Sequence, residues 1–244
     1  MTVTWEESGW EQVAPGVGRR RLPVWDCTVG LVVGAGGVLL VDTGSGLGEG
    51  ARLRAQAQAL TGRRVTHLAL THPHFDHILG AAAFAGAEVF AAVGVETALT
   101  ARGREALRAD AVRWGLDARV AEEAVDALPV PRHAVSGEWT LDLGLDGGRP
   151  VLLANVGPGH TAHDLAVLVP GDPGVVFCGD LVEESGEPQA GPDAVPDRWP
   201  AALDRLLALG GEEARYVPGH GAVVDAAFVR AQRDALAARS GVSE

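Results

Sequence analysis

The sequence predicts a single α/β domain, and three observations carry this prediction. Short apolar runs typical of strands recur along the 244 residues. Segments with apolar residues at helical spacing lie between these runs, and strands come both early and late in the chain, which is typical of an α/β arrangement. The chain contains no internal repeat and no long linker, so we expect one domain over residues 1–244.

The amino-terminal part is predicted to form short strands with tight turns, followed by a helix. Residues 28–33 and 38–42 are apolar runs joined by the glycine-rich segment 34–37, which predicts a hairpin. Residues 50–60 carry apolar side chains at helical spacing, and Gly62 is a suitable end for that helix.

The rest of the chain alternates between strands and helices. Further strands are predicted at residues 67–70, 88–91, 151–156, 165–169, 175–178 and 215–217. Helices are predicted at residues 78–84, 199–209 and 226–238. Residues 95–128 are rich in Ala, Arg and Glu and show no strand pattern, so we expect two helices inserted between strands there.

Composition and charge exclude several classes of function. The formal net charge of −12 opposes binding to nucleic acid, and we interpret the one basic run, Arg19–Arg20–Arg21, as a solvated strand or turn. No run approaches the roughly 18 apolar residues that a membrane span needs, and the first residues do not look like a secretory signal. Taking Cys27 and Cys178 as reduced thiols, we expect a cytoplasmic protein that acts on a small molecule.

Four of the predicted strands end in a short turn that delivers a potential metal ligand. The strand at 67–70 leads to His72, and the other three lead to His160, Asp180 and His220. Binding sites of α/β proteins lie at strand ends, so we expect these side chains to converge on one edge of the sheets.

The segment from Thr71 to His77 concentrates ligands for a metal. It holds His72, His74, Asp76 and His77, and imidazole nitrogen and carboxylate oxygen are the groups that bind zinc and similar divalent ions. In an extended or looped backbone, His72 and His74 point to the same side and can bind one ion. Asp76 and His77 then point elsewhere and can bind a second ion.

This His-x-His-x-Asp-His segment resembles the signature of the metallo-β-lactamase-fold superfamily. The later motifs follow in the family's order, and the resemblance extends from about residue 28 to about residue 225. They are Asp42–Thr43–Gly44, Gly159–His160–Thr161, Gly179–Asp180 and Pro218–Gly219–His220–Gly221. The resemblance implies a four-layer αββα sandwich with its metals at one edge.

The resemblance also implies how the ligands divide. His72, His74 and His160 would bind a first metal, Asp76, His77 and His220 would bind a second, and Asp180 would bridge the two. This set is similar to that of glyoxalase II and other dinuclear hydrolases of the superfamily, and it departs from true β-lactamases, which usually lack the bridging aspartate. We therefore expect two divalent metal ions, zinc first, with iron or manganese as alternatives.

Such a site predicts a metal-dependent hydrolase in which a bridging hydroxide attacks a carbonyl carbon. Asp76 and Asp180 are the expected catalytic residues, because Asp76 would orient the hydroxide and Asp180 would hold both metals. No Gly-x-Ser-x-Gly elbow is present, so no serine nucleophile is expected. Esters, thioesters and lactones all suit this chemistry, and residues 95–128, with Trp114, and 185–196 are the expected walls of the substrate pocket.

Two other functions stay open at this stage. A persulfide dioxygenase shares the fold and uses one iron held by two histidines and a carboxylate. A binding module without catalysis is the third hypothesis.

Several residues near the motifs have two interpretations. Asp42 and Asp164 are candidates to accept a hydrogen bond from a ligand histidine, as outer carboxylates often do. His163 is either such an outer partner or a substrate contact, or a solvent-facing loop residue. The remaining residues, His67, His133 and Cys178, are expected to be structural.

Overall fold

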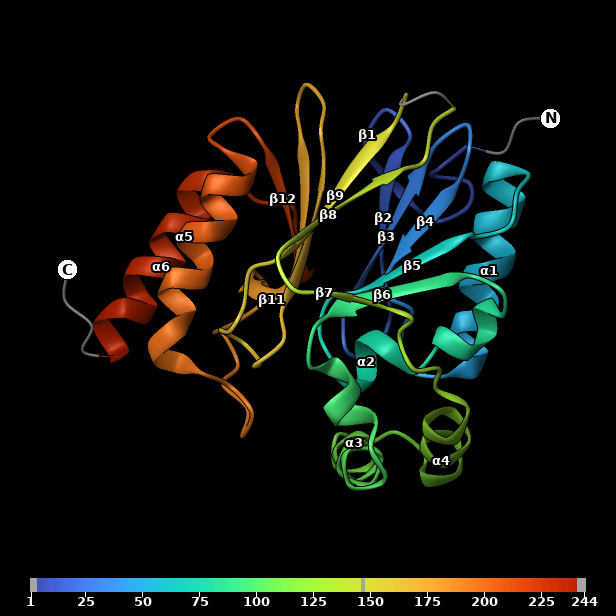
Figure 1. Cartoon of the computed structure of the whole chain (residues 1–244), viewed down its shortest axis with the longest axis horizontal. Helices are drawn as coiled ribbons and strands as arrows, with labels where there is room; N and C mark the ends of the chain where they lie inside the picture. Colours follow the sequence, from blue (N-terminus) through green and yellow to red (C-terminus); the bar gives the residue numbers. More distant parts are fainter. Residues whose placement is uncertain (1–3, 146–147, 241–244) are drawn as a thin grey trace.

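The computed structural model describes residues 4–145 and 148–240. Two β-sheets lie face to face in the middle of the molecule, and helices cover their outer faces (Figure 1). The predicted four-layer αββα sandwich is therefore confirmed. The expectation of one domain over the whole of residues 1–244 includes terminal residues that lie outside the described ranges.

The first sheet has seven strands in the order β1-β2-β3-β4-β5-β6-β7. Strands β1 to β4 pair antiparallel, and β4 to β7 pair parallel. The strands are β1 (Glu11–Ala14), β2 (Val17–Arg21), β3 (Thr28–Val33), β4 (Val38–Val41), β5 (His67–Leu70), β6 (Glu88–Ala92) and β7 (His133–Val135). The predicted hairpin is the β3–β4 pair.

The second sheet has five strands in the order β12-β11-β10-β9-β8. Its pairs are antiparallel except for β11 and β12, which run parallel. The strands are β8 (Glu138–Asp142), β9 (Pro150–Asn155), β10 (Leu165–Val169), β11 (Val175–Glu183) and β12 (Arg215–His220).

The helices form the outer layers and one end of the molecule. Helix α1 (Leu47–Thr61) packs beside the first sheet, whereas α5 (Trp199–Gly210) and α6 (Ala226–Ser240) cover the second (Figure 1). The segment 95–128 forms a 3-10 turn (Val95–Leu99), α3 (Ala101–Arg113) and α4 (Ala118–Ala127), and both helices lie beyond one edge of the sandwich. None of the described helices combines the length and the apolar character needed to cross a bilayer.

Two buried clusters of apolar side chains hold the layers together. The larger cluster includes Leu40 of the first sheet and Phe177 of the second, and it extends to Leu53 of α1. The smaller cluster fills the space under α5 and α6 around Trp199 and Tyr216. Burial of each such large side chain stabilises the fold by roughly 1.5–3 kcal/mol. The two edges of the sheets are thereby held in fixed positions next to each other.

The helix predicted at 78–84 is wrong in its bounds. The structure has α2 (Phe75–Ile78), then a break, then a 3-10 helix (Ala81–Phe84). The break occurs because the N–H of Gly80 bonds the carbonyl of Gly44, and the carbonyl of His77 accepts from Thr43, so this backbone is tied to the end of β4.

Other strand predictions also need correction. Strands β7 and β8 were not predicted, since β7 has three residues and β8 exposes all its side chains except Leu141. Strands β11 and β12 extend beyond 178 and 217, so Asp180 and His220 lie inside strands and not in turns that follow them.

Arg19 is also not solvated. It is buried, pairs with Glu11 at 2.7 Å and donates to the carbonyl of Gly221 at 2.7 Å.

Candidate metal centre

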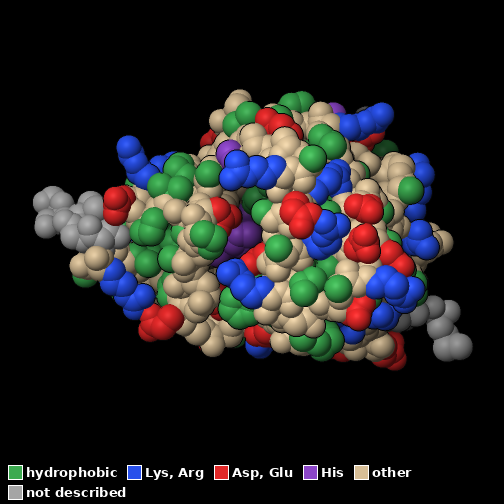
Figure 2. Space-filling model, turned by 90° about the horizontal axis from the view of Figure 1, so that it is seen from below, with side chains coloured by type: hydrophobic (Ala, Val, Ile, Leu, Met, Phe, Trp, Pro, Cys, Tyr) green, Lys and Arg blue, Asp and Glu red, His purple; other side chains and the backbone are tan. Residues whose placement is uncertain are grey.

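The seven predicted ligand residues lie together at the edge where the two sheets meet. His72 and His74 follow β5, and Asp76 and His77 form the first turn of α2. The other three come from the second sheet: His160 from the β9–β10 loop, Asp180 from β11 and His220 from β12. Figure 2 shows histidine side chains in a hollow near the middle of this face, and His74, His160 and His220 line the cavity there.

One group within this cluster consists of His72, His74, His160 and Asp180. The three imidazole rings lie 4.6–4.7 Å apart, centroid to centroid. Asp180 Oδ2 lies 3.6 Å from His72 Nε2 and 3.5 Å from His160 Nε2. These atoms surround one position that a single ion can occupy.

A second group consists of His77, His220 and Asp180, with Asp76 beside it. His77 Nε2 lies 3.1 Å from Asp180 Oδ1, and His220 Nε2 lies 3.3 Å from Asp180 Oδ2. Asp76 Oδ2 is 3.4 Å from His220 Nε2 and 3.7 Å from His77 Nε2. Asp180 thus belongs to both groups, as a bridging carboxylate would.

Each of the five histidines has one ring nitrogen that points away from the cluster, which we call its outer nitrogen, and one that points into it, its inner nitrogen. Each outer nitrogen bonds a hydrogen-bond acceptor outside the cluster. Carbonyl oxygens accept from His160 Nδ1 and His220 Nδ1, namely Gln189 O at 3.1 Å and Trp25 O at 2.7 Å. Asp193 Oδ2 accepts from His74 Nε2 at 3.0 Å.

Asp42 supports the remaining two histidines, one from each group. His77 Nδ1 donates to Asp42 Oδ2 at 2.8 Å. The hydroxyl of Thr71 donates its proton to the same carboxylate at 2.7 Å, so Thr71 Oγ1 can only accept from His72 Nδ1, 3.0 Å away. The predicted outer role of Asp42 is therefore matched by the structure.

These outer bonds leave the inner nitrogen of each imidazole without a proton when the ring is neutral. His74 Nδ1 and His160 Nε2 then face each other at 3.0 Å, and His77 Nε2 and His220 Nε2 at 3.4 Å, lone pair against lone pair. Among the described residues, His72 Nε2 and Asp180 Oδ1 are buried without a hydrogen-bond partner. A cation in each group satisfies all of these atoms, so the donor set fits bound metal.

The electrostatics of the two groups differ. Burial lowers the pKa of His72 well below its ordinary value and that of His160 to about 4. Burial opposes charge on His77 and His220 as well, but Asp180 raises both pKa values, that of His220 to about 9. The surroundings of His77 and His220 therefore favour positive charge, as a cation site should.

Irregular pairing at the end of β11 aims Asp180 into the cluster. The register between β11 and β12 shifts on both sides of Gly179, which has φ +54°. On β12, a side chain at Gly219 would place its Cβ 1.8 Å from Asp180 Oδ1. Glycine at 219 therefore provides the space that the bridging carboxylate occupies.

Asp164 does not contact a ligand imidazole, contrary to the candidate role given above. It accepts from the backbone N–H of Thr161 at 3.0 Å and from the Thr161 hydroxyl at 2.7 Å, so it braces the turn that carries His160. His163 lies against Gly94 and outside the cluster.

The expected structural residues lie elsewhere. His133 bonds Glu88 at 2.9 Å and stacks on Phe90, and His67 bonds Thr66 at 2.8 Å. Cys178 is a free, buried thiol within β11, as expected.

Sequence reasoning missed four residues around the candidate metal ligands. Asp193, Gln189 and Trp25 hold the outer nitrogens, but they lie far along the chain from the histidines that they contact. Cys27 is buried with Sγ 3.6 Å from His77 Nδ1, and burial raises the pKa of its thiol. No spacing signal marks any of them, because only the fold brings these loops to the site.

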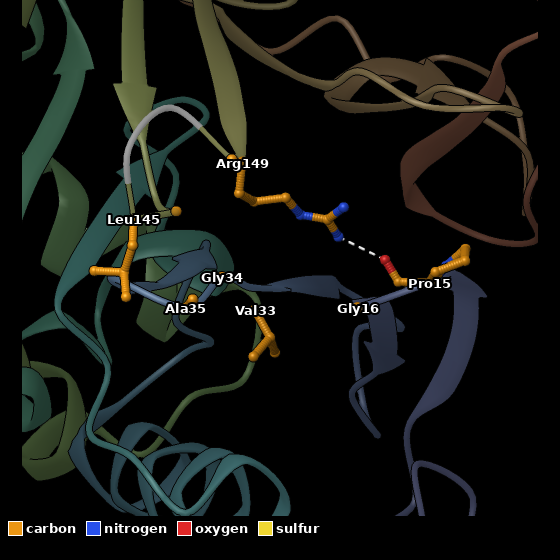
Figure 3. Close-up of a pocket in the computed structure, with 9 residues that line it drawn as sticks. Pro15, Gly16, Val33, Gly34, Ala35, Leu145 and Arg149 are labelled. Atoms are coloured by element: carbon orange, nitrogen blue, oxygen red, sulfur yellow. Dashed lines mark hydrogen bonds between the residues drawn. The ribbon is translucent and has the colours of Figure 1, made fainter.

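A cavity of about 1170 Å³ opens onto the cluster. The segment from Ala98 to Trp114 forms one wall and the loop from Ser185 to Asp193 forms another, so both expected segments line the cavity, but residues 115–128, which include α4, do not. A separate hollow of about 310 Å³ is lined by none of the cluster residues (Figure 3). There Arg149 donates to the carbonyl of Pro15 at 2.5 Å, and the other lining residues are apolar or glycine.

Comparisons with known proteins agree with this geometry. A family model described as the metallo-beta-lactamase superfamily matches residues 22–220. The metallo-beta-lactamase FIM-1 from Pseudomonas aeruginosa, in its mono-zinc form, superposes with a TM-score of 0.69 at 20% identity, covering 96% of each chain. The metallo-beta-lactamase from Pontibacter korlensis gives 0.69 at 21% identity, covering 93% of this chain and 97% of that one. That from Hirschia baltica gives 0.67 at 17% identity, with 93% and 96% covered.

These structural likenesses show the fold, and the family match spans most of the chain. Its four ligand-bearing motifs meet at one edge of that fold, in two groups of His and Asp side chains that are able to bind metal. The chain therefore belongs to the metallo-beta-lactamase superfamily.

Proposed function

We propose that the protein is a hydrolase that uses two divalent metal ions, zinc first, to cleave an ester, thioester or lactone bond of a small molecule. His72, His74 and His160 hold the first ion, Asp76, His77 and His220 hold the second, and Asp180 bridges them. These seven residues resemble the ligand set of glyoxalase II.

One observation carries the proposal. Each of the five imidazoles has its outer nitrogen bonded to an acceptor and its inner nitrogen turned toward a carboxylate that the two groups share. Metal-binding histidines have this arrangement, because the outer bond fixes the tautomer and the ring orientation. A hydrogen-bonded cluster without metal would instead need a proton on each inner nitrogen, and burial opposes that charge on His72 and His160.

When bound, a pair of divalent ions supplies an activated water near neutral pH and stabilises the negative charge that develops on a carbonyl oxygen. The protein's own groups position the reaction. Asp76 lines the cavity and its carboxylate lies 3.4 Å from His220 Nε2, so it can orient a water and accept its proton. The cavity walls hold the substrate carbonyl above the cluster.

The test is metal analysis of protein purified without added metal, followed by turnover of ester, thioester, lactone and lactam substrates before and after zinc loading. Near two zinc ions per chain, with hydrolysis that a chelator abolishes and zinc restores, supports the proposal. One iron per chain with thiol-dependent oxygen uptake would contradict it and establish the dioxygenase. A protein that binds metal and turns over none of the panel would favour the binding module.

A further inference from the structure

The cavity over the cluster has an apolar side that does not contain metal ligands. Its floor carries Asp180, whose Oδ1 is buried and has no hydrogen-bond partner among the described residues. From this floor the cavity continues along α3, where Gly103, Ala106 and Ala109 line it. Leu107 lines it as well, so this part of α3 presents small or apolar residues to the cavity, and Asp110 and Arg113 line it further toward the end of the helix.

Aromatic side chains close the same space. Trp25 and Trp114 both line the cavity, Trp114 directly follows the last residue of α3, and the Trp25 indole donates to the Trp114 carbonyl at 3.3 Å. Phe75 packs edge-on against Trp25 with centroids 5.2 Å apart. Trp114 is nevertheless 58% exposed, an unusual state for a tryptophan that packs only within its own chain.

Away from the ligand cluster, the charged groups along the cavity are paired with one another or with neighbouring side chains. Among the described lining residues Arg113 is the one Lys or Arg, and it pairs with Asp110 of the same helix. The carboxylates that do not bind metal in our proposal are also paired. Glu183 accepts from Ser185, Glu187 pairs with Arg239, and Asp193 accepts from His74.

We infer that the substrate carries, beside its scissile carbonyl, an uncharged apolar group that lies along α3 next to Trp25 and Trp114. This inference rests on the proposed function, since it places the carbonyl over the cluster. An apolar group gains by leaving water for the wall of alanine, glycine and indole. A terminal carboxylate on this side of the cavity meets carboxylates and one arginine that already pairs with Asp110, so it gains little and loses its hydration.

The first test uses the zinc-loaded protein and 4-nitrophenyl esters of acetate, butyrate, hexanoate and octanoate. We expect kcat/KM to rise about two- to fourfold per added methylene, the range for half to full burial of that group. The monoester of a dicarboxylic acid with the length of octanoate should react at least tenfold more slowly than the octanoate ester. Equal kcat/KM for all chain lengths would overturn the inference and leave the proposed hydrolase standing.

Ala106→Trp fills the apolar side and should reduce the octanoate-to-acetate ratio of kcat/KM by at least tenfold. Ala106→Asp adds a charge to the apolar side and little volume, so it should reduce the same ratio without overpacking. A reduction in both variants therefore cannot be attributed to misfolding of the Trp variant. The matched control is Ala235→Trp, at an exposed position of α6 that does not line the cavity, and it should keep the wild-type ratio. A ratio unchanged in both Ala106 variants would also overturn the inference.

A binding measurement separates this inference from the proposed function. Octanohydroxamate and acetohydroxamate carry the same metal-chelating group and differ only in the apolar tail. By titration calorimetry on zinc-loaded protein, octanohydroxamate should bind at least tenfold more tightly, and Ala106→Trp should remove the difference. If no ester, thioester or lactone is hydrolysed but this difference is found, the proposed function fails and the apolar subsite stands; equal affinities contradict the subsite.

Discussion

The five clustered imidazoles differ in the group that accepts from or contacts their outer nitrogen. This group decides which amino-acid substitutions can disturb the position of each ring. Two rings depend on backbone carbonyls, which no substitution removes directly. His74 depends on the side chain of Asp193, and His72 and His77 depend on one buried carboxylate, Asp42. A substitution at Asp193 therefore acts on the first group alone, whereas a substitution at Asp42 acts on both groups.

Asp180→Ala should weaken the second metal more than the first. A carboxylate between two cations offsets their repulsion, whereas His72, His74 and His160 remain to hold the first ion. Turnover should fall by roughly 100-fold or more, since loss of one ion costs a few kcal/mol of transition-state stabilisation. Metal content, circular dichroism and turnover on one preparation check this. A variant that keeps both metals and near-normal turnover would show that Asp180 is not the bridge.

Asp193→Asn should lower the affinity of the first site for zinc by about tenfold. The amide still accepts from His74 Nε2, but it lacks the negative charge that raises the basicity of the ring. Chelator competition monitored with cobalt absorption measures this affinity without turnover. Asp197→Asn, at an exposed position a few residues further along, is the matched control and should bind like wild type. Equal affinities in both variants would remove Asp193 from the site.

Asp164→Asn should change the pH dependence of stability in chelator-treated protein. Burial raises the pKa of Asp164 from 3.8 to about 7, although bonds from Thr161 oppose the rise. Between about pH 4 and pH 7 the folded chain holds a proton that the unfolded chain releases, so this carboxyl's contribution to the free energy of unfolding falls as pH rises. Urea unfolding should show wild type losing stability relative to the variant across this window. Parallel pH profiles would contradict the assignment.

At the scale of elements, the irregular pairing at the end of β11 determines where the side chain of Asp180 points. The shifts in register on both sides of Gly179 turn Asp180 toward both groups of ligands, while Phe177 and Val176 before it stay in regular pairing with β12. The site is thus built where the ladder departs from regularity, as bulges near active sites commonly are.

Gly219→Ala tests this close approach between β12 and β11. The new methyl group would lie 1.8 Å from Asp180 Oδ1, so the carboxylate must move out of its position. Zinc affinity of the second site should fall at least tenfold, with a stability cost of about 1–3 kcal/mol for overpacking. Equilibrium zinc titration and urea unfolding measure the two effects. Gly186→Ala, where nothing lies within 4 Å, is the matched control; identical behaviour of both variants would refute the packing argument.

At the scale of the whole molecule, the candidate metal centre joins the two sheets. His72, His74 and His77 come from the side of the first sheet, and His160, Asp180 and His220 come from the second. A backbone bridge between Cys27 and His220 connects the same two halves. Bound ions would therefore hold the sandwich closed at this edge.

Removal of metal should accordingly lower the stability of the whole chain. Each ion that binds only the folded state adds about 4 kcal/mol when its free concentration is 1,000 times Kd. We expect chelator to reduce Tm and the free energy of unfolding in one cooperative transition, and zinc to restore both. His67→Ala, outside the cluster, should respond to chelator as wild type does. An unchanged Tm after verified metal removal would show that the centre does not join the two halves.

The sequence by itself determined which residues form the cluster and which strands deliver them. His72, His74, Asp76 and His77 lie within six positions of the chain, and glycines stand next to His160, Asp180 and His220 near the ends of apolar runs, so these local patterns and the family resemblance that they carry were sufficient. It also placed both pocket walls, because a helical insertion and a Pro/Gly-rich loop are local properties.

Only the tertiary structure decided what surrounds those ligands. Asp193 lies 119 positions from His74, and Trp25 lies 195 positions from His220, so no local pattern connects them. The shared carboxylate of Asp42, the space left by Gly219 and the apolar side of the cavity along α3 are likewise contacts between distant segments. Such contacts depend on how the layers pack, and packing is a property of the whole fold and not of any one stretch of sequence.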